Sequence, residues 1–264
     1  MIVLYEHPLS PYAQKVKIAL RAKGVDFEAR LPKGLGSGAA ADDFGAGNPR
    51  REVPLLIDGD QRIFDSTVIL DYVEERWPEP ALMPAAPAAR AGTRMIEEVM
   101  DTHYEAINWG LSELRNFRRA EGEKLERMTA RAGEQIAGAH RWLAQRLGEA
   151  PWFGGAAFGR ADLAVVPFLN GSAGFGFAPP AGSALAAWLV RVNEVPAVAE
   201  TAAEAAPAAE AMKGAWRALE AGGFRRQYRD HRLEWMMRSG GVDVVLDGLD
   251  RDNIRLAGDL DGAG

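Results

Sequence analysis

The sequence predicts two domains of different fold class: an α+β domain with the element order βαβ-ββα, followed by an all-α domain. Short apolar or alternating segments that are typical of strands occur only in residues 1–78. Prolines then interrupt any regular element from Pro78 to Pro87, and beyond them Ala, Glu, Arg and Leu recur at helical spacing. We therefore expect the first domain over residues 1–78, a linker over 79–87, a helical domain over 88–221 and a C-terminal extension over 222–264.

The first part of the α+β domain has the pattern of a strand, a helix and a second strand. Met1–Tyr5 is apolar and branched, which is typical of a strand. Gly24 supplies the left-handed residue that ends a helix, Asp26–Leu31 alternates as a strand, and the connection over 32–52 is long and rich in small residues. The helix between these strands is indicated by an apolar stripe at Tyr12, Val16, Ala19 and Leu20.

The second part has the pattern of a hairpin followed by a helix. Val53–Ile57 and Gln61–Phe64 are strand segments joined by Asp58-Gly59, a strong signal for a two-residue hairpin turn. Asp65-Ser66 is expected to cap the next helix, which ends at Trp77-Pro78.

The rest of the chain is expected to be helical up to Gly222, where its charge pattern changes. Arginines come first in the tail and aspartates later, which predicts a solvated extension folded back on the body, with a partner-binding arm as the alternative. The helices expected before this tail are Ala88–Asn108, Arg119–Leu147, Arg160–Asn170, Ala184–Val192 and Ala197–Leu219.

Composition bounds the kinds of site that this chain can hold. It contains no cysteine, so any thiol chemistry must use a thiol that a substrate supplies. The net charge of -6 argues against a general nucleic-acid surface. The sequence shows no apolar run long enough for a membrane span, no signal-peptide pattern and no histidine spacing typical of a metal site. We therefore expect a cytoplasmic protein without a metal.

Local patterns in both domains resemble the glutathione S-transferase superfamily. In the first domain they are Leu9-Ser10-Pro11-Tyr12, Glu52-Val53-Pro54-Leu55 and Phe64-Asp65-Ser66, in this order and spacing. In the second, Trp152-Phe153-Gly154-Gly155 precedes Gly159-Arg160-Ala161-Asp162, which looks like the family's entry into a buried helix, with Asp162 bonding backbone N–H groups. The resemblance covers about residues 1–220 and implies that the first domain is thioredoxin-like.

Ser10 is the candidate catalytic residue. It stands directly before Pro11, which is favoured at the first position of a helix, so its side chain lies at the positive end of a helix dipole. The local sequence by itself predicts only that Ser10 is a helix N-cap. The resemblance implies that its hydroxyl also stabilises the thiolate of glutathione. The two roles are compatible, because a hydroxyl both accepts and donates hydrogen bonds. Tyr5 and Tyr12 are the alternative donors.

Six further residues are the candidates for binding the rest of glutathione. The resemblance implies a cis Val53-Pro54 bond, with the Val53 main chain pairing with the cysteinyl backbone, although proline is also tolerated at the start of a strand. Asp65 and Ser66 suit the ammonium and carboxylate of the γ-glutamyl group, and a plain capping pair is the alternative. Lys33 and Arg51 are the cationic candidates for the glycyl carboxylate.

The resemblance implies a glutathione transferase that acts in detoxification as a homodimer. Its thiolate would attack a small hydrophobic electrophile, by conjugation or by ether or halide cleavage. A glutathione-dependent isomerase of the zeta-like kind is an alternative, although the Ser-Ser-Cys run of that class is absent. A non-catalytic binding or interaction protein is another, motivated by the charged tail. The residues expected to line the electrophile cleft, if they are not ordinary core positions, are Leu9, Tyr12, Tyr104, Trp109 and Phe117.

Overall fold

The computed structural model describes residues 1–33, 44–45, 48–222, 228 and 230–254. Its N-terminal part holds a four-stranded sheet, whose strands are β1 (Ile2–Tyr5), β2 (Phe27–Arg30), β3 (Leu55–Asp58) and β4 (Gln61–Phe64). The strand order is β2-β1-β3-β4. β1 is parallel to β2 and antiparallel to β3, and β4 is antiparallel to β3. The predicted βαβ-ββα order is confirmed.

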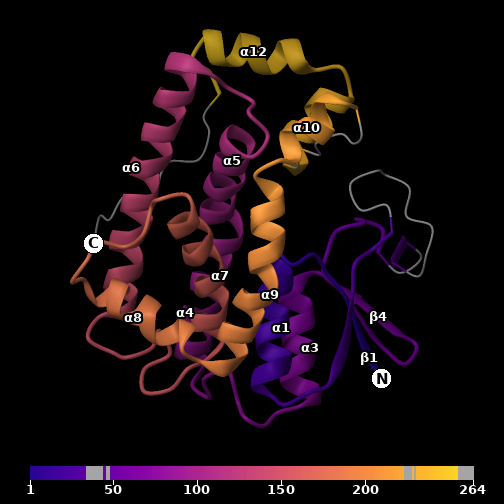
Figure 1. Ribbon diagram of the computed structural model, residues 1–264, viewed down its shortest axis with the longest axis vertical. Coiled ribbons are helices and arrows are strands. Elements are labelled where there is room, and N and C mark those ends of the chain that lie inside the picture. The colour runs from indigo at the N-terminus through magenta and orange to yellow at the C-terminus, as the bar shows by residue number, and fades with distance from the viewer. Residues whose placement is uncertain (34–43, 46–47, 223–227, 229, 255–264) are drawn as a thin grey trace.

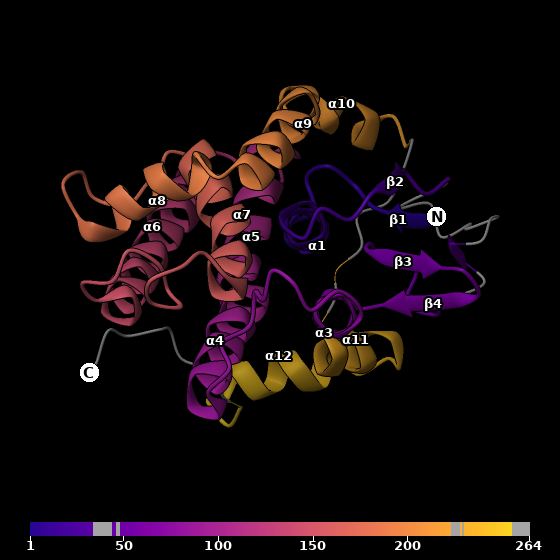
Figure 2. The same ribbon diagram turned by 90° about the horizontal axis from the view of Figure 1, so that it is seen from below.

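Two helices of the N-terminal part, α1 (Pro11–Ala22) and α3 (Ser66–Arg76), lie between the sheet and most of the remaining helices (Figure 1, Figure 2). α1 buries Val16, Ala19 and Leu20 of the predicted apolar stripe and also Ile18, and α3 buries Ile69, Leu70 and Val73. The helices therefore carry the contact between the sheet and the rest of the molecule.

The C-terminal part is built from helices that follow one another without a named strand among the described residues. No helix in those ranges is both long enough and apolar enough to cross a membrane. The helices are α4 (Pro87–Val99), the π-helical turn η1 (Met100–Tyr104), α5 (Glu105–Arg115), α6 (Gly122–Leu147), α7 (Arg160–Gly174), α8 (Ala184–Asn193), α9 (Pro196–Met212), α10 (Ala215–Glu220), α11 (His231–Arg238) and α12 (Val242–Asp250).

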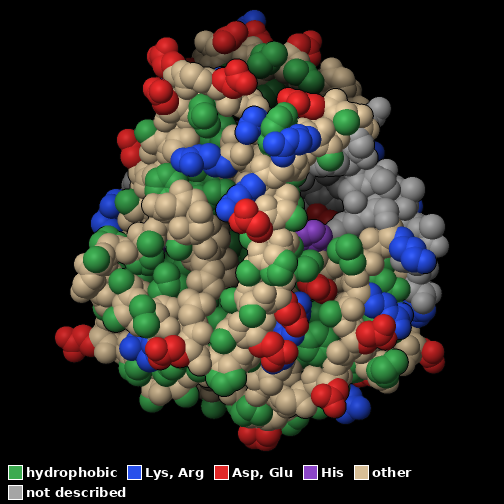
Figure 3. All heavy atoms as spheres, in the orientation of Figure 1, with side chains coloured by type: hydrophobic (Ala, Val, Ile, Leu, Met, Phe, Trp, Pro, Cys, Tyr) green, Lys and Arg blue, Asp and Glu red, His purple; other side chains and the backbone are tan. Residues whose placement is uncertain are grey.

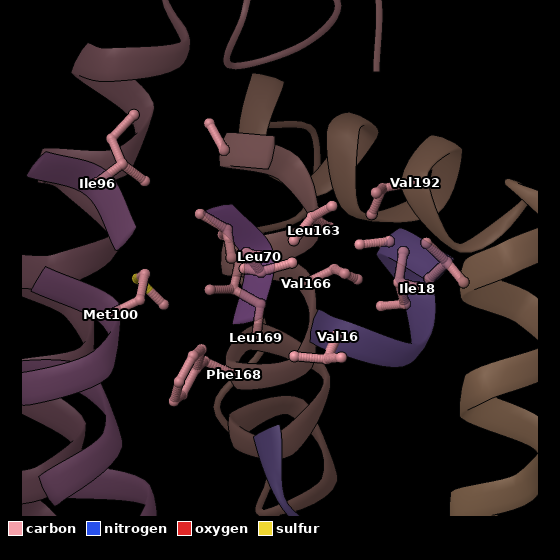
Figure 4. Close-up of a cluster of buried hydrophobic side chains, with 14 of the residues drawn as sticks. Val16, Ile18, Leu70, Ile96, Met100, Leu163, Val166, Phe168, Leu169 and Val192 are labelled. Atoms are coloured by element: carbon pink, nitrogen blue, oxygen red, sulfur yellow. The ribbon is translucent and has the colours of Figure 1, made fainter. Parts of the chain in front are cut away.

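One hydrophobic core joins the two parts. α7 is buried along nearly its whole length, so it is the central helix of the molecule. Figure 4 shows Val16 and Ile18 of α1 beside Leu163 and Val166 of α7, and all four side chains are at most 2% exposed. The N-terminal part is thus packed against α7 by apolar contacts.

The start of α7 is fixed by Asp162, as the sequence predicts. Its carboxylate accepts hydrogen bonds from the backbone N–H of Gly159 and of Phe153, both at 3.0 Å, and from Nε1 of Trp188 at 2.8 Å. Because Asp162 is fully buried, these donors replace the water that it loses. The carboxylate therefore ties the preceding loop and α8 to the central helix.

Two predicted helices of the second part are joined or divided differently in the structure, whereas α6 begins three residues later than predicted and α7 ends four residues later. The helix predicted over Ala88–Asn108 continues through η1 and α5 to Arg115, because Gly110 inside it costs only about 1 kcal/mol relative to alanine and does not stop it. The helix predicted over Ala197–Leu219 is divided into α9 and α10 at Lys213-Gly214.

The tail contains two helices that the sequence analysis did not predict, α11 and α12. Asp230 caps α11 by accepting a hydrogen bond from the N–H of Leu233 at 2.9 Å. The side chains of Trp235 and Leu246 on these helices are 66% and 56% exposed. Before them, the Tyr228 hydroxyl donates to Glu113 Oε2 of α5 at 3.0 Å, so the chain does return to the body at that point.

Replacing Asp162 with alanine should lower the free energy of unfolding by about 3 kcal/mol or more, because each buried donor left without a partner costs about 1–3 kcal/mol. Trp188→Phe removes one of the three donors and is the milder comparison. Urea denaturation followed by tryptophan fluorescence measures the difference for Asp162→Ala, and circular dichroism serves for both variants. A loss below about 1 kcal/mol for Asp162→Ala would contradict this account of the helix start.

Candidate functional site

The register of the sheet brings the predicted site segments to one edge. Tyr5, the last residue of β1, pairs with Leu55, the first residue of β3, and Leu55 also pairs with Phe64, the last residue of β4. The loop that leads to Ser10, the segment before Leu55 and the turn after Phe64 therefore leave the sheet at the same end. α1 and α3 both begin there, so two helix N-termini with their positive partial charges meet at this edge.

Ser10 is the N-cap of α1. Its backbone is extended, with φ -75° and ψ 114°, and its Oγ accepts a hydrogen bond from the N–H of Ala13 at 3.3 Å. The N–H of Ser10 donates to the carbonyl of His7 at 2.8 Å, which fixes the approach of the loop. Within the described residues the Ser10 hydroxyl hydrogen has no acceptor, and the side chain is half-buried. The hydroxyl thus caps the helix with a lone pair and keeps its hydrogen for a ligand.

The two alternative hydroxyl donors are engaged elsewhere. Tyr12 donates its hydroxyl hydrogen to the carbonyl of Asp101 at 2.7 Å, and burial, with nearby carboxylates, holds its pKa above the ordinary value. Tyr5 is 5% exposed and packs against Phe44, with ring centroids 5.7 Å apart. Of the three hydroxyls considered from the sequence, Ser10 is the one that the fold leaves available.

The Val53-Pro54 peptide bond is cis, as the sequence resemblance implies. The N–H and C=O of Val53 have no hydrogen-bond partner among the described residues, and β3 begins two residues later. The segment is held by Asn48, which is 1% exposed and donates from Nδ2 to the carbonyl of Glu52 at 2.5 Å. A backbone donor and acceptor are thus presented at the sheet edge in a fixed position.

Asp65 and Ser66 form the start of α3. Asp65 is the N-cap, with a left-handed φ of 72°, and its Oδ1 accepts from the N–H groups of Thr67 and Val68 at 3.0 and 3.4 Å. Asp65 Oδ2 is 3.2 Å from Nη1 of Arg50, and the side chain stays 38% exposed. Ser66 is buried. The turn offers the Asp65 carboxylate beside the N–H and hydroxyl of Ser66, which suits a zwitterionic ligand.

Arg50 is a site residue that the sequence analysis missed. Besides Asp65, it binds Glu52, with Nε 2.7 Å from Oε2. Its N–H and that of Arg51 both donate to Oδ1 of Asn48, at 3.2 and 3.1 Å. The run Arg50-Arg51-Glu52 is the sequence signal for this charged turn, but nothing in the run shows which arginine faces Asp65.

The two cations predicted for the glycyl carboxylate lie at the same end of the molecule. Lys33 is exposed and follows β2, whose last residue, Arg30, pairs with Tyr5 of β1. Arg51 is also exposed and has a left-handed φ of 53°. The long connection on which that assignment depends falls largely outside the described residues.

The residues predicted to line an electrophile cleft are only partly brought together. Leu9 and Tyr12 are half-buried beside Ser10. Trp109 packs edge-on against Tyr228, with ring centroids 4.5 Å apart. Tyr104 is fully buried and its hydroxyl lies 2.9 Å from both His140 Nε2 and Ser172 Oγ, and Phe117 is 5% exposed. The structure therefore places Tyr104 and Phe117 in the packed interior rather than beside Ser10.

Two carboxyl groups stand one helical turn apart near Tyr12. Burial raises the pKa of Asp101 to about 6, even though its Oδ2 is 2.5 Å from Lys15 Nζ. Burial, together with the charges of Asp101 and Glu52, raises the pKa of Glu105 to about 7. Sequence analysis missed both, because neither belongs to a motif.

Sequence analysis also missed a buried cluster of charged side chains beneath the site. Glu97 of α4 accepts from Lys15 Nζ of α1 at 2.8 Å and from Arg160 of α7, with Nε at 2.9 Å and Nη2 at 2.7 Å. Arg160 Nη1 also binds Asp71 of α3. The side chains of Lys15, Glu97 and Arg160 are at most 2% exposed. Their separation along the chain leaves no local pattern by which the cluster can be predicted.

One face of the molecule carries side chains of both charges (Figure 3). Figure 3 shows acidic and basic side chains interspersed with apolar ones over one face of the molecule. Over the residues that the structure describes, no group of three or more His, Cys, Asp or Glu side chains is arranged to hold a metal ion.

Comparison with known proteins places the site segments within one family. The family model for the glutathione S-transferase N-terminal domain matches residues 4–81. The chain is 34% identical over 96 residues to a stringent starvation protein A homolog of Coxiella burnetii, a match that covers 36% of this chain and 44% of that protein. It is 30% identical over 179 residues to maleylacetoacetate isomerase of Pseudomonas aeruginosa, covering 66% of this chain and 83% of that protein.

Solved structures agree with this placement. The rice protein OsGSTU1, solved in complex with glutathione, superposes with a TM-score of 0.64 at 30% identity, over 76% of this chain and 91% of that chain. The match to the Coxiella protein spans less than half of that relative, whereas the match to the rice structure spans most of both chains.

Glu105→Gln should make the protein more stable at about pH 8 and leave it unchanged at about pH 4, because the unfolded pKa of a glutamate is about 4.3. Between that value and the folded pKa of about 7, the folded state binds more protons than the unfolded state, so stability falls as the pH rises. Urea unfolding across this pH range measures the difference in stability between the variant and the wild-type protein. Glu98→Gln, at an exposed position on α4, is the control. Lower stability of Glu105→Gln at about pH 8 would contradict the assignment.

Proposed function

Because the chain belongs to the glutathione S-transferase superfamily, we propose that it binds glutathione and directs the thiolate of glutathione at a small apolar electrophile. The observation that carries the proposal is the Ser10 hydroxyl, which caps α1 with a lone pair and has no acceptor for its hydrogen within the described residues. A donor at the positive end of a helix stabilises a thiolate, which is the nucleophilic form of a thiol.

The remaining polar groups at the sheet edge match the rest of glutathione. The Asp65 carboxylate is assigned to the γ-glutamyl ammonium, and the hydroxyl and N–H of Ser66, at the N-terminus of α3, to its carboxylate. The N–H and C=O of Val53 are assigned to the cysteinyl backbone, in the manner of an added strand. Lys33 and Arg51 remain the candidates for the glycyl carboxylate.

The proposed step is nucleophilic substitution or addition by sulfur. The thiol releases its proton to solvent and the thiolate forms a carbon–sulfur bond. In a substitution the halide or alkoxide leaves with the bonding electrons, whereas in an addition the π electrons of the attacked bond move to the neighbouring atom, which takes up a proton from solvent. Ser10 donates to the sulfur and takes no proton from it, because a serine hydroxyl accepts protons poorly. Leu9 and Tyr12 beside it are the proposed walls for the apolar part of the electrophile.

Isomerisation is the nearest alternative within the enzyme class. The relative from Pseudomonas aeruginosa is named maleylacetoacetate isomerase, and glutathione addition followed by its elimination would use the same Ser10. The absence of cysteine, and so of the Ser-Ser-Cys run, favours transfer. Location in the cytoplasm, a role in detoxification and assembly as a homodimer are parts of the same proposal, and the exposed Val68 of α3 and Met95 of α4 offer apolar surface for a second copy.

Ser10→Ala should reduce kcat/KM with a reactive aromatic halide by about tenfold to a hundredfold, because a hydrogen bond to a charged group contributes about 1.5–3 kcal/mol. Affinity for glutathione, measured by calorimetry, should stay unchanged. Ser183→Ala is the matched control, because Ser183 caps α8 through the N–H of Ala186 at 3.1 Å and loses the same kind of cap far from the site. Full turnover by Ser10→Ala with intact glutathione binding would remove Ser10 from the mechanism.

The tail favours a second candidate function, that of an interaction protein. Apolar side chains of α11 and α12, including Leu233, Trp235, Val244 and Leu246, are each more than two-fifths exposed. A soluble chain that presents such residues on adjacent helices has surface suited to a partner.

Truncation after Gly222 separates the two functions. If the tail binds a partner, the truncated chain should keep its glutathione turnover and lose a protein that the full chain captures in a pull-down. The full chain with Trp235→Ala and Leu246→Ala is the companion variant, since it keeps the length of the tail. Loss of turnover on truncation would contradict the interaction role and make the tail part of the active-site cover.

A further inference from the structure

The first turn of α3 is held from the inside by the helical part of the molecule. Thr67, which directly follows Ser66, donates its hydroxyl to Glu97 Oε1 at 3.1 Å. Its carbonyl accepts from Arg160 Nη2 at 3.2 Å. Glu97 lies on α4 and Arg160 on α7, so side chains from two helices outside the sheet domain fix one residue of the proposed glutathione site.

The same carboxylate also holds the helix that carries Ser10. Glu97 Oε1, which accepts from Thr67, lies 2.8 Å from Nζ of Lys15 on α1. Lys15 is little more than one helical turn beyond Ser10. One oxygen atom therefore bridges the helix whose N-terminus is assigned to the sulfur and the helix whose N-terminus is assigned to the γ-glutamyl group.

The charge state of the bridge is fixed by its neighbours. Burial alone would raise the pKa of Glu97, but the charges of Lys15 and Arg160 outweigh it and hold the pKa below its ordinary value. Glu97 is thus an anion with every oxygen engaged: Oε1 by Lys15 and Thr67, and Oε2 by Arg160. Because charge-assisted hydrogen bonds are directional, the Glu97 carboxylate fixes the positions of the three side chains that donate to it. Thr67 is the uncharged donor among the three.

We propose that Glu97 is a positioning residue for glutathione, acting through Thr67 to fix the first turn of α3 relative to the first turn of α1. The proposal rests on the assignment of these two helix N-termini to glutathione. Neither residue is expected to touch the reacting sulfur. Loss of the hydrogen bond between Glu97 and Thr67 should therefore weaken the binding of glutathione and leave the chemical step intact.

Thr67→Val tests this inference with the smallest change, because it keeps the shape of the side chain and removes its hydrogen bond. We expect the Kd for glutathione by calorimetry and the KM for glutathione to rise about tenfold, on the scale of one hydrogen bond to a charged group, with kcat unchanged. Thr67→Ser, which restores the hydroxyl, should return both values to those of the wild-type protein.

Thr201→Val is the matched control. Thr201 is 2% exposed, donates its hydroxyl to the carbonyl of Ala197 at 2.7 Å and accepts from Arg21 Nη1 at 2.6 Å, but it lies on α9. The Thr201→Val variant therefore makes the same chemical change in a buried threonine that also has an arginine partner. We expect Thr201→Val to alter stability and to leave the Kd for glutathione unchanged.

The double variant Thr67→Val with Glu97→Gln tests whether the two residues act together. If Glu97 acts through Thr67, the double variant should bind glutathione no more weakly than Glu97→Gln alone. A Thr67→Val protein that binds glutathione as the wild type does, or a Thr201→Val protein weakened equally, would overturn the inference while the proposed function stands. No heat from the wild-type protein with glutathione would overturn both.

Discussion

Two buried cations share one carboxylate where the sheet domain meets the helical part, and the arrangement of the molecule depends on that contact. Lys15 of α1 and Arg160 of α7 both bind Glu97 of α4. Removing these charges from water costs several kcal/mol for each ion, so the cluster is tolerated only when all its partners are in place. Apolar packing of α1 on α7 supplies the main attraction, and the charges restrict how the two surfaces fit.

The site follows from this contact and from the register of the sheet. Because Tyr5, Leu55 and Phe64 are aligned across three strands, the segments that leave those strands meet at one edge. α1 and α3 begin at this edge and pass back over the charge cluster, so their N-termini are held from below as well as by their caps. A ligand with an anionic sulfur and a carboxylate is therefore met by two helix N-termini whose spacing the protein has already set.

The sequence predicts the parts of this structure that depend on neighbours along the chain. The order of strands, the caps at Ser10 and Asp65 and the carboxylate of Asp162 are all local patterns, and the structure contains them. Contacts between distant positions leave no such pattern, which is why the Glu97 cluster and the Arg50–Asp65 pair were missed. Aromatic spacing in the α domain likewise cannot separate core from cleft, because the structure buries Tyr104 and Phe117 and pairs Trp109 with Tyr228. The helices α11 and α12 were missed because the prediction for the tail rested on the order of its charges and not on its apolar spacing.

We infer that glutathione binds with its sulfur at the head of α1 and that the protein favours the thiolate there. Ultraviolet difference absorbance of the thiolate, recorded for the glutathione complex across a range of pH, measures this directly. We expect a thiol pKa for bound glutathione at least about one unit below that of free glutathione, since a charge-assisted hydrogen bond of about 1.5 kcal/mol corresponds to about one pKa unit. A bound thiol that titrates as it does in free solution would contradict it.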